Sequence, residues 1–175
     1  FCETVLGVAF AIVFSRNFRG KNISKTLCLM PFAATPVAVG VVWKLILDPT
    51  LGAANYILGF FGIEGQQFFS AENALNTLIF IEIWQGTPIV ALIVAAGLST
   101  LPTDCLESAR VDGANAWQSF WRITFPLMQT TIFTAFILRF MEVSKAFDII
   151  YSTTQGGPVY NSETLNLYAY VTAFQ

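Results

Sequence analysis

The sequence predicts an all-α, polytopic bundle of membrane-spanning helices, because it is apolar, sparsely charged and divided into long apolar runs. Of its 175 residues, 55% are hydrophobic and 11% are charged, whereas about a quarter of the residues are charged in an ordinary soluble domain. A helix needs about 20 mostly apolar residues to cross the hydrocarbon core of a bilayer. We expect one transmembrane domain with these complete or partial spans: 4–14, 27–47, 74–98, 127–151 and 164–175.

The first and last of these runs are too short to cross a bilayer alone. The chain begins with Phe1 rather than methionine and ends at Gln175 inside an apolar run, so we expect a protein truncated at both ends. Glu3 stands where a signal peptide would carry basic residues. This favours the inner half of a spanning helix over a leader peptide.

Prolines interrupt the second and third runs. Pro31 and Pro36 lie in 27–47, and Pro88 lies in 74–98. Each proline removes a backbone donor and clashes with the preceding turn, so we expect these helices to be bent. Helix packing explains such bends, and a pathway shaped between bent helices is the alternative.

The third run also carries polar residues that are candidates for the solute path. Glu82 and Gln85 are three residues apart, which places them on the same side of a helix. An acid within hydrocarbon usually faces a cavity or a partner. A structural hydrogen bond between helices is the alternative for these two residues.

The fourth run contains charges of alternating sign at intervals of three residues: Arg139, Glu142, Lys145 and Asp148. Neighbours at this spacing pair along one helix, which predicts a ladder of ion pairs. The alternative is a polar face near the solute path, at an interface between two membrane subunits. Glu142, Lys145 and Asp148 are therefore further candidates for the solute path.

Basic residues orient the chain, since Lys and Arg are enriched in cytoplasmic loops. The loop between the first two runs holds four basic residues, and the segment 99–126 holds Arg110 and Arg122. The loops 48–73 and 152–163 hold none. We therefore place 99–126 in the cytoplasm and the latter two loops outside.

The cytoplasmic segment 99–126, here called the connector, is polar and has a glycine near its middle. A glycine inside a helix costs about 1 kcal/mol relative to alanine, so Gly113 predicts a bend or a close approach of another backbone. Two short helices joined near Asp112 and Gly113 are the simplest arrangement. A helix lying on lipid is the alternative, but such helices are usually rich in Lys and Arg. The connector has two arginines and three acidic residues, which favours a protein partner.

Composition excludes several other classes of function. The net charge of −2 provides no basic surface for nucleic acid. The sequence has no histidine, and its three cysteines are far apart, so it predicts no metal site, disulfide framework or cofactor. It also lacks the Gly-x-x-x-x-Gly-Lys-Ser/Thr motif that binds nucleotide phosphates, and no nucleophile motif supports an enzyme.

The connector resembles the EAA loop of the permease subunits of binding-protein-dependent ABC transporters, a family with a MetI-like transmembrane domain. In these subunits an E-A-A-x-x-x-D-G-A-type signature precedes F-x-x-I-x-x-P-L. The matching residues are Glu107, Ser108, Ala109, Asp112, Gly113, Ala114, Phe120, Ile123, Pro126 and Leu127. Ser108 stands where the signature often has alanine, which replaces one small residue by another.

Residues outside the connector resemble the sugar and glycerol-phosphate branch of this family. They include Met30-Pro31-Phe32, Trp84-Gln85 and Gly156-Gly157-Pro158. The resemblance implies an importer subunit in a prokaryotic inner membrane, with a carbohydrate or polyol solute. It also implies three partners: an ABC ATPase that docks on the connector, a second permease that is most simply a paralogue, and an extracytoplasmic solute-binding protein.

The same resemblance implies a coupling role for five residues of the connector: Glu107, Ala109, Asp112, Gly113 and Ala114. ATP hydrolysis would then belong to the partner, and this chain would not be an enzyme. An ion-coupled secondary carrier is the alternative function, since acids within the membrane can couple ion movement. That alternative leaves the connector unexplained.

Overall fold

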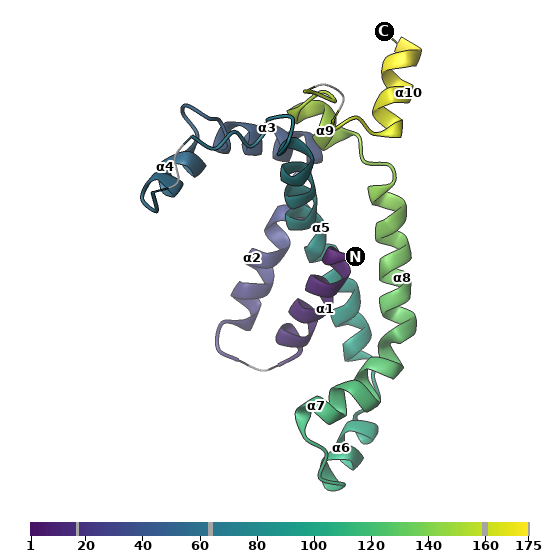
Figure 1. The fold of residues 1–175 in the computed structure, drawn as a ribbon. Helices are drawn as coiled ribbons and strands as arrows, with labels where there is room; N and C mark the ends of the chain where they lie inside the picture. The colour runs from purple at the N-terminus through teal and green to yellow at the C-terminus, as the bar shows by residue number, and fades with distance from the viewer. Residues whose placement is uncertain (17, 63–64, 159–160, 175) are drawn as a thin grey trace. The chain divides into compact units, whose positions relative to one another are not determined.

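The computed structural model describes residues 1–16, 18–62, 65–158 and 161–174, without the side chains of Thr103 and Arg110. Over these residues the chain is helical and contains no strand, which confirms the predicted all-α class (Figure 1). The helices in chain order are α1 (Cys2–Ser15), α2 (Lys21–Ala33), α3 (Pro36–Ile46), α4 (Ala53–Gly59), α5 (Ala74–Ser99), α6 (Thr103–Val111), α7 (Ala116–Ser119), the π-helical turn η1 (Phe120–Thr124), α8 (Phe125–Val143), α9 (Asp148–Thr153) and α10 (Leu165–Phe174).

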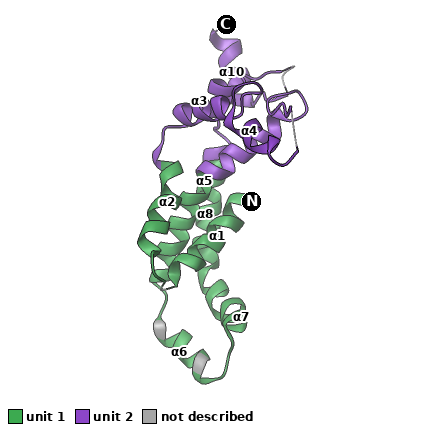
Figure 2. Cartoon of the chain, turned by 90° about the vertical axis from the view of Figure 1, so that its left-hand side faces the viewer, with its two compact units in different colours: residues 1–32, 86–141 green, residues 33–85, 142–175 purple. Residues whose placement is uncertain are grey.

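The chain folds into two compact units, coloured separately in Figure 2. Unit 1 consists of residues 1–32 and 86–141, and unit 2 of residues 33–85 and 142–175. Each unit has its own apolar core. The core of unit 1 contains Ala11, Val90, Val94, Met128 and Ala135. The core of unit 2 contains Val39, Leu47, Leu78, Ile81, Ile149, Ile150 and Leu167.

Small residues allow close helix packing in unit 1. A Cβ atom on Gly7 would lie 2.6 Å from Val90 Cγ1, and one on Gly97 would lie 2.7 Å from Thr131 Cγ2. Glycine therefore lets α1 approach α5, and α5 approach α8. Such contacts between small residues are typical of helices packed within membranes, where burial in lipid alone does not hold helices together.

In unit 2, α3 packs against α9 and against the first part of α5. Gly40 has no side chain where the hydroxyl of Ser152 lies. Trp43 makes edge-to-face contacts with Phe80 and Trp84, at ring-centroid distances of 5.6 and 5.3 Å. Aromatic pairs in this geometry stabilise packing by about 0.5–1.5 kcal/mol beyond their buried area.

The run 27–47 is divided between α2 and α3. The helix is interrupted at Ala34 and Thr35, and Thr35 is extended, with φ −67° and ψ 141°. A residue that precedes proline avoids helical geometry, so Pro36 explains the position of the break and begins α3. Pro31 remains inside α2.

Two described helical segments are long and apolar enough to cross a membrane: α5, and the continuous stretch Ala116–Val143 that includes α8. The broken pair of α2 and α3 passes the same criteria when it is counted as one span. The prediction of spanning helices is therefore supported for the second, third and fourth runs by length and composition. The shorter α1 is apolar over Cys2–Ser15.

The sequence suggested one helix for the fourth run, but the structure divides this run into two helices. α8 ends at Val143 and α9 begins at Asp148, so the predicted ion-pair ladder along a single helix is wrong. The backbone carbonyls of Ser144 and Ala146 instead accept hydrogen bonds from Asn166 Nδ2 at 3.2 Å and Thr164 Oγ1 at 3.3 Å. Side chains near the start of α10 thus satisfy carbonyls that the end of α8 leaves without helical partners.

Candidate functional site

The connector consists of α6, a turn and α7, followed by η1. The turn has the geometry of a glycine helix stop: Gly113 has a φ of +80°, and the Ala114 N–H donates to the Ala109 carbonyl at 2.9 Å. This bond closes the end of α6 in the Schellman pattern. Asp112 donates through its N–H to the Ser108 carbonyl, also at 2.9 Å. Four of the five predicted coupling residues therefore form one local structure.

The prediction of two short helices joined near Asp112 and Gly113 is confirmed. No atom of the described chain lies within 4 Å of a Cβ built on Gly113. Within this chain, a glycine is favoured at position 113 because the backbone is left-handed there, and not because a neighbouring atom leaves no room for a side chain. Glu107 and Asp112 are exposed, whereas Ala109 is buried.

α7 begins with a capping box that the sequence analysis did not identify. Asn115 Oδ1 accepts from the Gln118 N–H at 2.9 Å, and Gln118 Oε1 accepts from the Asn115 N–H at 3.0 Å. Asparagine followed three residues later by glutamine is the sequence signal for this cap. A helix stop and a helix start thus lie next to each other, and together they fix the direction of the chain through the turn.

Pro126 explains the π-helical turn between α7 and α8. Proline has no N–H and clashes with the carbonyl four residues before it, which here belongs to Arg122. The helix widens at this point, and the Phe125 N–H bonds to the Phe120 carbonyl, five residues earlier. This wider turn lets the helix continue from Ala116 to Val143.

Apolar side chains remain exposed on the connector. Val111 is 88% exposed and Trp117 is 70% exposed. Trp117 packs edge to face with Trp121 at a ring-centroid distance of 5.7 Å, and Trp121 contacts Phe125 at 5.2 Å. Exposed aromatic residues on an otherwise polar segment are typical of surfaces that bind a partner.

The polar residues of the third run lie in different environments. Gln85 is buried, and its side-chain amide nitrogen Nε2 donates to the Ala34 carbonyl at 3.1 Å. Ala34 is at the break between α2 and α3, so Gln85 stabilises a carbonyl that the break releases. Glu82, one turn earlier on α5, is partly buried.

The three other candidates for the solute path lie around the break after α8. Glu142 is in the last turn of α8, Lys145 is in the connecting segment, and Asp148 is the first residue of α9. All three are exposed. Asp148 is also at a helix N-terminus, where a negative charge is favourable.

A buried ion pair in unit 1 was not predicted from the sequence. Arg139 of α8 donates from Nε to Glu3 Oε2 of α1, and a second, longer contact joins Arg139 Nη2 to Glu3 Oε1 at 3.4 Å. The side chains are 12% and 8% exposed, respectively. Gly86 of α5 leaves the space that the guanidinium occupies, since a Cβ there would overlap it. The three helices therefore meet at one charged contact.

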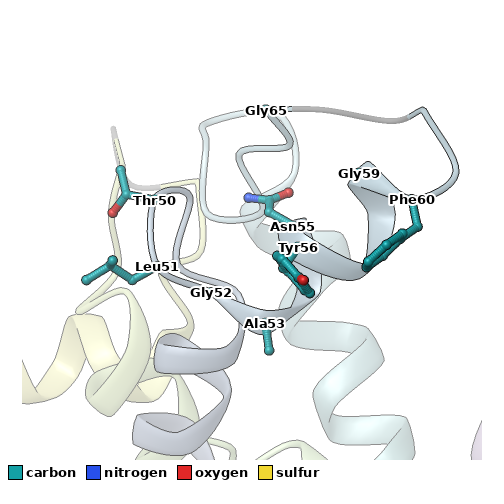
Figure 3. Close-up of a pocket in the computed structure, with 9 residues that line it drawn as sticks. All are labelled: Thr50, Leu51, Gly52, Ala53, Asn55, Tyr56, Gly59, Phe60 and Gly65. Atoms are coloured by element: carbon teal, nitrogen blue, oxygen red, sulfur yellow. The ribbon is translucent and has the colours of Figure 1, made fainter.

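A pocket of about 870 Å³ lies in unit 2 between the turn at 50–53, α4 and Gly65 (Figure 3). Asn55 holds this segment together: its Nδ2 donates to the Pro49 carbonyl at 3.2 Å and to the Gln66 carbonyl at 3.0 Å. Its Oδ1 is buried and accepts no hydrogen bond from the residues that the structure describes.

Comparison with known proteins identifies the family. Residues 3–173 match the family described as binding-protein-dependent transport system inner membrane component. The chain belongs to this family. The resemblance found in the connector is thereby confirmed, and the family description places its members in the inner membrane.

Relatives within the permease family align along nearly the whole chain. A probable ABC transporter permease protein, y4oQ of Sinorhizobium fredii, is 39% identical over 99% of this chain and 56% of its own length. The trehalose/maltose transport system permease protein MalF of Thermococcus litoralis is 31% identical over 96% of this chain and 57% of its own length. The chain thus spans little more than half the length of these curated relatives.

A solved structure supports the fold of this family member. A bacterial ABC transporter involved in the import of the acidic polysaccharide alginate has a chain with a TM-score of 0.83 and 21% sequence identity. The alignment covers 97% of this chain and 61% of that one.

In the permease fold, replacement of Gln85 by leucine is expected to destabilise unit 2. The substitution leaves the Ala34 carbonyl without its donor, which costs about 1–3 kcal/mol when the group is buried. Thermal unfolding of the purified, intact transporter would measure this loss. Gln67→Leu, at an exposed loop position, is the control and should leave the unfolding temperature unchanged. An unchanged stability of Gln85→Leu would contradict the structural role of the amide.

Proposed function

We propose that the chain is part of the membrane pathway of an ABC importer for a sugar or a related polyol. In this proposal a separate ATPase docks on the connector, and ATP binding and hydrolysis drive alternating access of the pathway. The chain itself is a transport subunit and not an enzyme.

The names of the relatives support this class of solute. They include the trehalose/maltose permease of Thermococcus litoralis and the sn-glycerol-3-phosphate transport system permease protein UgpA of Agrobacterium fabrum, which is 34% identical over 91% of this chain. Another relative, y4oQ of Sinorhizobium fredii, is named as a probable ABC transporter permease protein. The family match therefore favours the importer over the carrier.

The observation that carries the proposal is the shape of the connector. A polar segment folds into two short helices with a fixed turn between them and exposes Val111 and Trp117. Such an element presents a defined surface to a protein outside the bilayer. We assign Ala109, Asp112, Gly113 and Ala114 to the turn that shapes this surface. We assign exposed Glu107 to contact with the ATPase.

The solute path is proposed to include the polar residues of unit 2: Glu82, Gln85, Glu142, Lys145 and Asp148. Hydroxyl groups of a sugar pair well with carboxylate, amide and ammonium groups. Gln85 would act in this role through the geometry of the helix break that it stabilises. Glu142, Lys145 and Asp148 are exposed in this chain, which leaves them accessible to solute or to a second subunit.

Two further partners complete the proposed importer. A second permease, most simply a paralogue, would form the other half of the pathway, and a solute-binding protein would deliver the solute from outside. A related solved structure is titled as an alginate transporter in complex with an alginate pentasaccharide-bound periplasmic protein, with a TM-score of 0.82. Nucleic acid has no place in this function.

Uptake into vesicles that contain the complete transporter tests the proposal. Accumulation of labelled sugar is expected to require ATP and the binding protein, and to persist when ion gradients are collapsed. A transporter with the partner ATPase inactivated is the matched control and should accumulate nothing. Uptake driven by an ion gradient without ATP would show that the chain is a carrier.

A further inference from the structure

An uncharged apolar patch lies on the loop between α3 and α5. It is formed by the side chains of Leu51, Tyr56, Ile57, Phe60 and Phe61, and we call it the outer patch. Leu51 is 92% exposed, and Phe60 and Phe61 are each 76% exposed. Figure 3 shows Leu51 on the turn before α4, Tyr56 on α4 and Phe60 directly after its end. Tyr56 and Phe60 contact each other at a ring-centroid distance of 5.2 Å. Large apolar side chains exposed in this number mark contact with a protein or a membrane.

The outer patch is held directly beside the end of α3. Gly52 is buried, and a Cβ on it would lie 2.6 Å from the Asp48 nitrogen and still closer to the carbonyls of Ile46 and Asp48. Asp48 Oδ1 accepts from the Thr50 and Leu51 N–H groups, both at 2.9 Å. These contacts compress the connection, so α4 cannot move far from the terminus of α3.

The helix that precedes the outer patch in the chain, α3, is itself apolar and partly exposed. It belongs to the broken pair that is apolar enough to cross a membrane, and it exposes Val41, Val42 and Leu45. The outer patch therefore follows this apolar segment directly along the chain, since α3 ends at Ile46 and α4 begins at Ala53. The hydrogen bonds from Leu51 and Thr50 lower the pKa of Asp48, so the charged carboxylate is the form that these bonds stabilise.

The chemistry of the outer patch fits lipid better than a transient protein partner. No charged residue occurs between Pro49 and Gly62, so the segment offers no charge complementarity to a protein that binds and dissociates. Between binding events a docking surface is exposed to water, at a cost of about 25 cal/mol for each Å² of apolar area. A bilayer covers the surface permanently. Trp and Tyr are also enriched where a membrane meets water, and Tyr56 belongs to the outer patch.

We propose that the outer patch lies at the outer surface of the inner membrane, where the bilayer meets water. Its aromatic and aliphatic side chains would then lie among the lipid acyl chains and headgroups. α4 would then be an interfacial helix that anchors the outer end of α3. Unlike the interfacial helices that are rich in Lys and Arg, α4 carries no charge, so its aromatic and aliphatic side chains alone would hold it in the boundary region. The inference depends on membership of the family and not on the identity of the solute.

Spin labels on the complete transporter, reconstituted in phospholipid vesicles, test this location. Cys2, Cys28 and Cys105 are first replaced by serine, and single cysteines are then introduced as Phe60→Cys or Phe61→Cys. The collision rate of the spin label with oxygen, which concentrates in lipid, is compared with its collision rate with a water-soluble nickel chelate. The oxygen-to-nickel ratio at both positions is expected to be several-fold higher than at Gln67→Cys, an exposed control in the same loop.

Each other result would overturn the inference. A ratio equal to that of the Gln67→Cys control would place the outer patch in water. Exclusion of both reagents would place it under another protein chain. Loss of nickel and oxygen collisions only after addition of the solute-binding protein would identify a docking surface for that protein. Because the readout is collision rather than uptake, it remains informative even if the proposed transport function is incorrect.

Discussion

Replacement of Gly113 by valine is expected to reduce ATP-driven uptake about tenfold. The φ of Gly113 is +80°, and an L-residue in left-handed geometry costs about 1–2 kcal/mol. If the turn must adopt this shape to dock, the same free energy weakens docking by roughly tenfold. Co-purification of the ATPase with the membrane subunits and uptake into vesicles would measure the two effects together.

Two variants separate this effect from general destabilisation. Gly113→Asn should retain most of the uptake, because asparagine tolerates left-handed geometry better than other non-glycine residues. Gly20 also has a positive φ, +89°, and no atom of the described chain lies within 4 Å of a Cβ built on it. It lies outside the connector. Gly20→Val should therefore strain the chain without weakening ATPase docking. Normal docking and uptake in Gly113→Val would refute the role of the turn.

The connector was predictable because its structure is local. A glycine after a helix and asparagine with glutamine at the next start act over a few residues. The break before Pro36 is local for the same reason. The long apolar run 74–98 likewise predicted α5 (Ala74–Ser99) without knowledge of its neighbours.

The break after α8 could not be predicted, because its cause lies elsewhere in the chain. Ser144, Lys145 and Ala146 are all compatible with a helix, so the sequence favoured continuation. Thr164 and Asn166 supply the donors that satisfy the carbonyls at the break. Their contribution depends on the tertiary position of α10, which no local pattern encodes.

The partner of Arg139 was missed for a similar reason. The sequence placed Glu142 at the correct spacing for a pair along a helix. The structure shows a bond from Arg139 to Glu3, which is 136 residues away. An acid near the start of an apolar run was a signal that a buried partner was needed. The sequence alone did not show which cation filled that need.

Replacement of Arg139 by methionine is expected to destabilise the transporter by about 3–5 kcal/mol. The substitution leaves the buried Glu3 carboxylate without its counter-ion, and the loss of one partner of a buried pair has a cost of this size. Thermal unfolding of the intact transporter would measure the loss. Lys145→Met removes an exposed charge and is the control, with an expected change within about 0.5 kcal/mol.

A double variant tests whether the pair itself is responsible. In Glu3→Gln with Arg139→Met, the Glu3 carboxylate is no longer present as a charge without its counter-ion, so the double variant should be more stable than Arg139→Met alone. The stability change of the double variant, minus the sum of the changes in Glu3→Gln and Arg139→Met, gives the interaction free energy of the pair. Additive losses would mean that Arg139 stabilises the protein through contacts other than Glu3.

Gly86 provides an independent test of the same contact. Because a Cβ on Gly86 would overlap the guanidinium of Arg139, Gly86→Ala should displace that group and weaken its bond to Glu3. Overpacking of this kind costs about 1–3 kcal/mol. The cost should fall when Arg139 is replaced by the shorter alanine, since the space is then free. An equal cost in both backgrounds would show that Gly86 is required for the helix backbone and not for the position of the arginine.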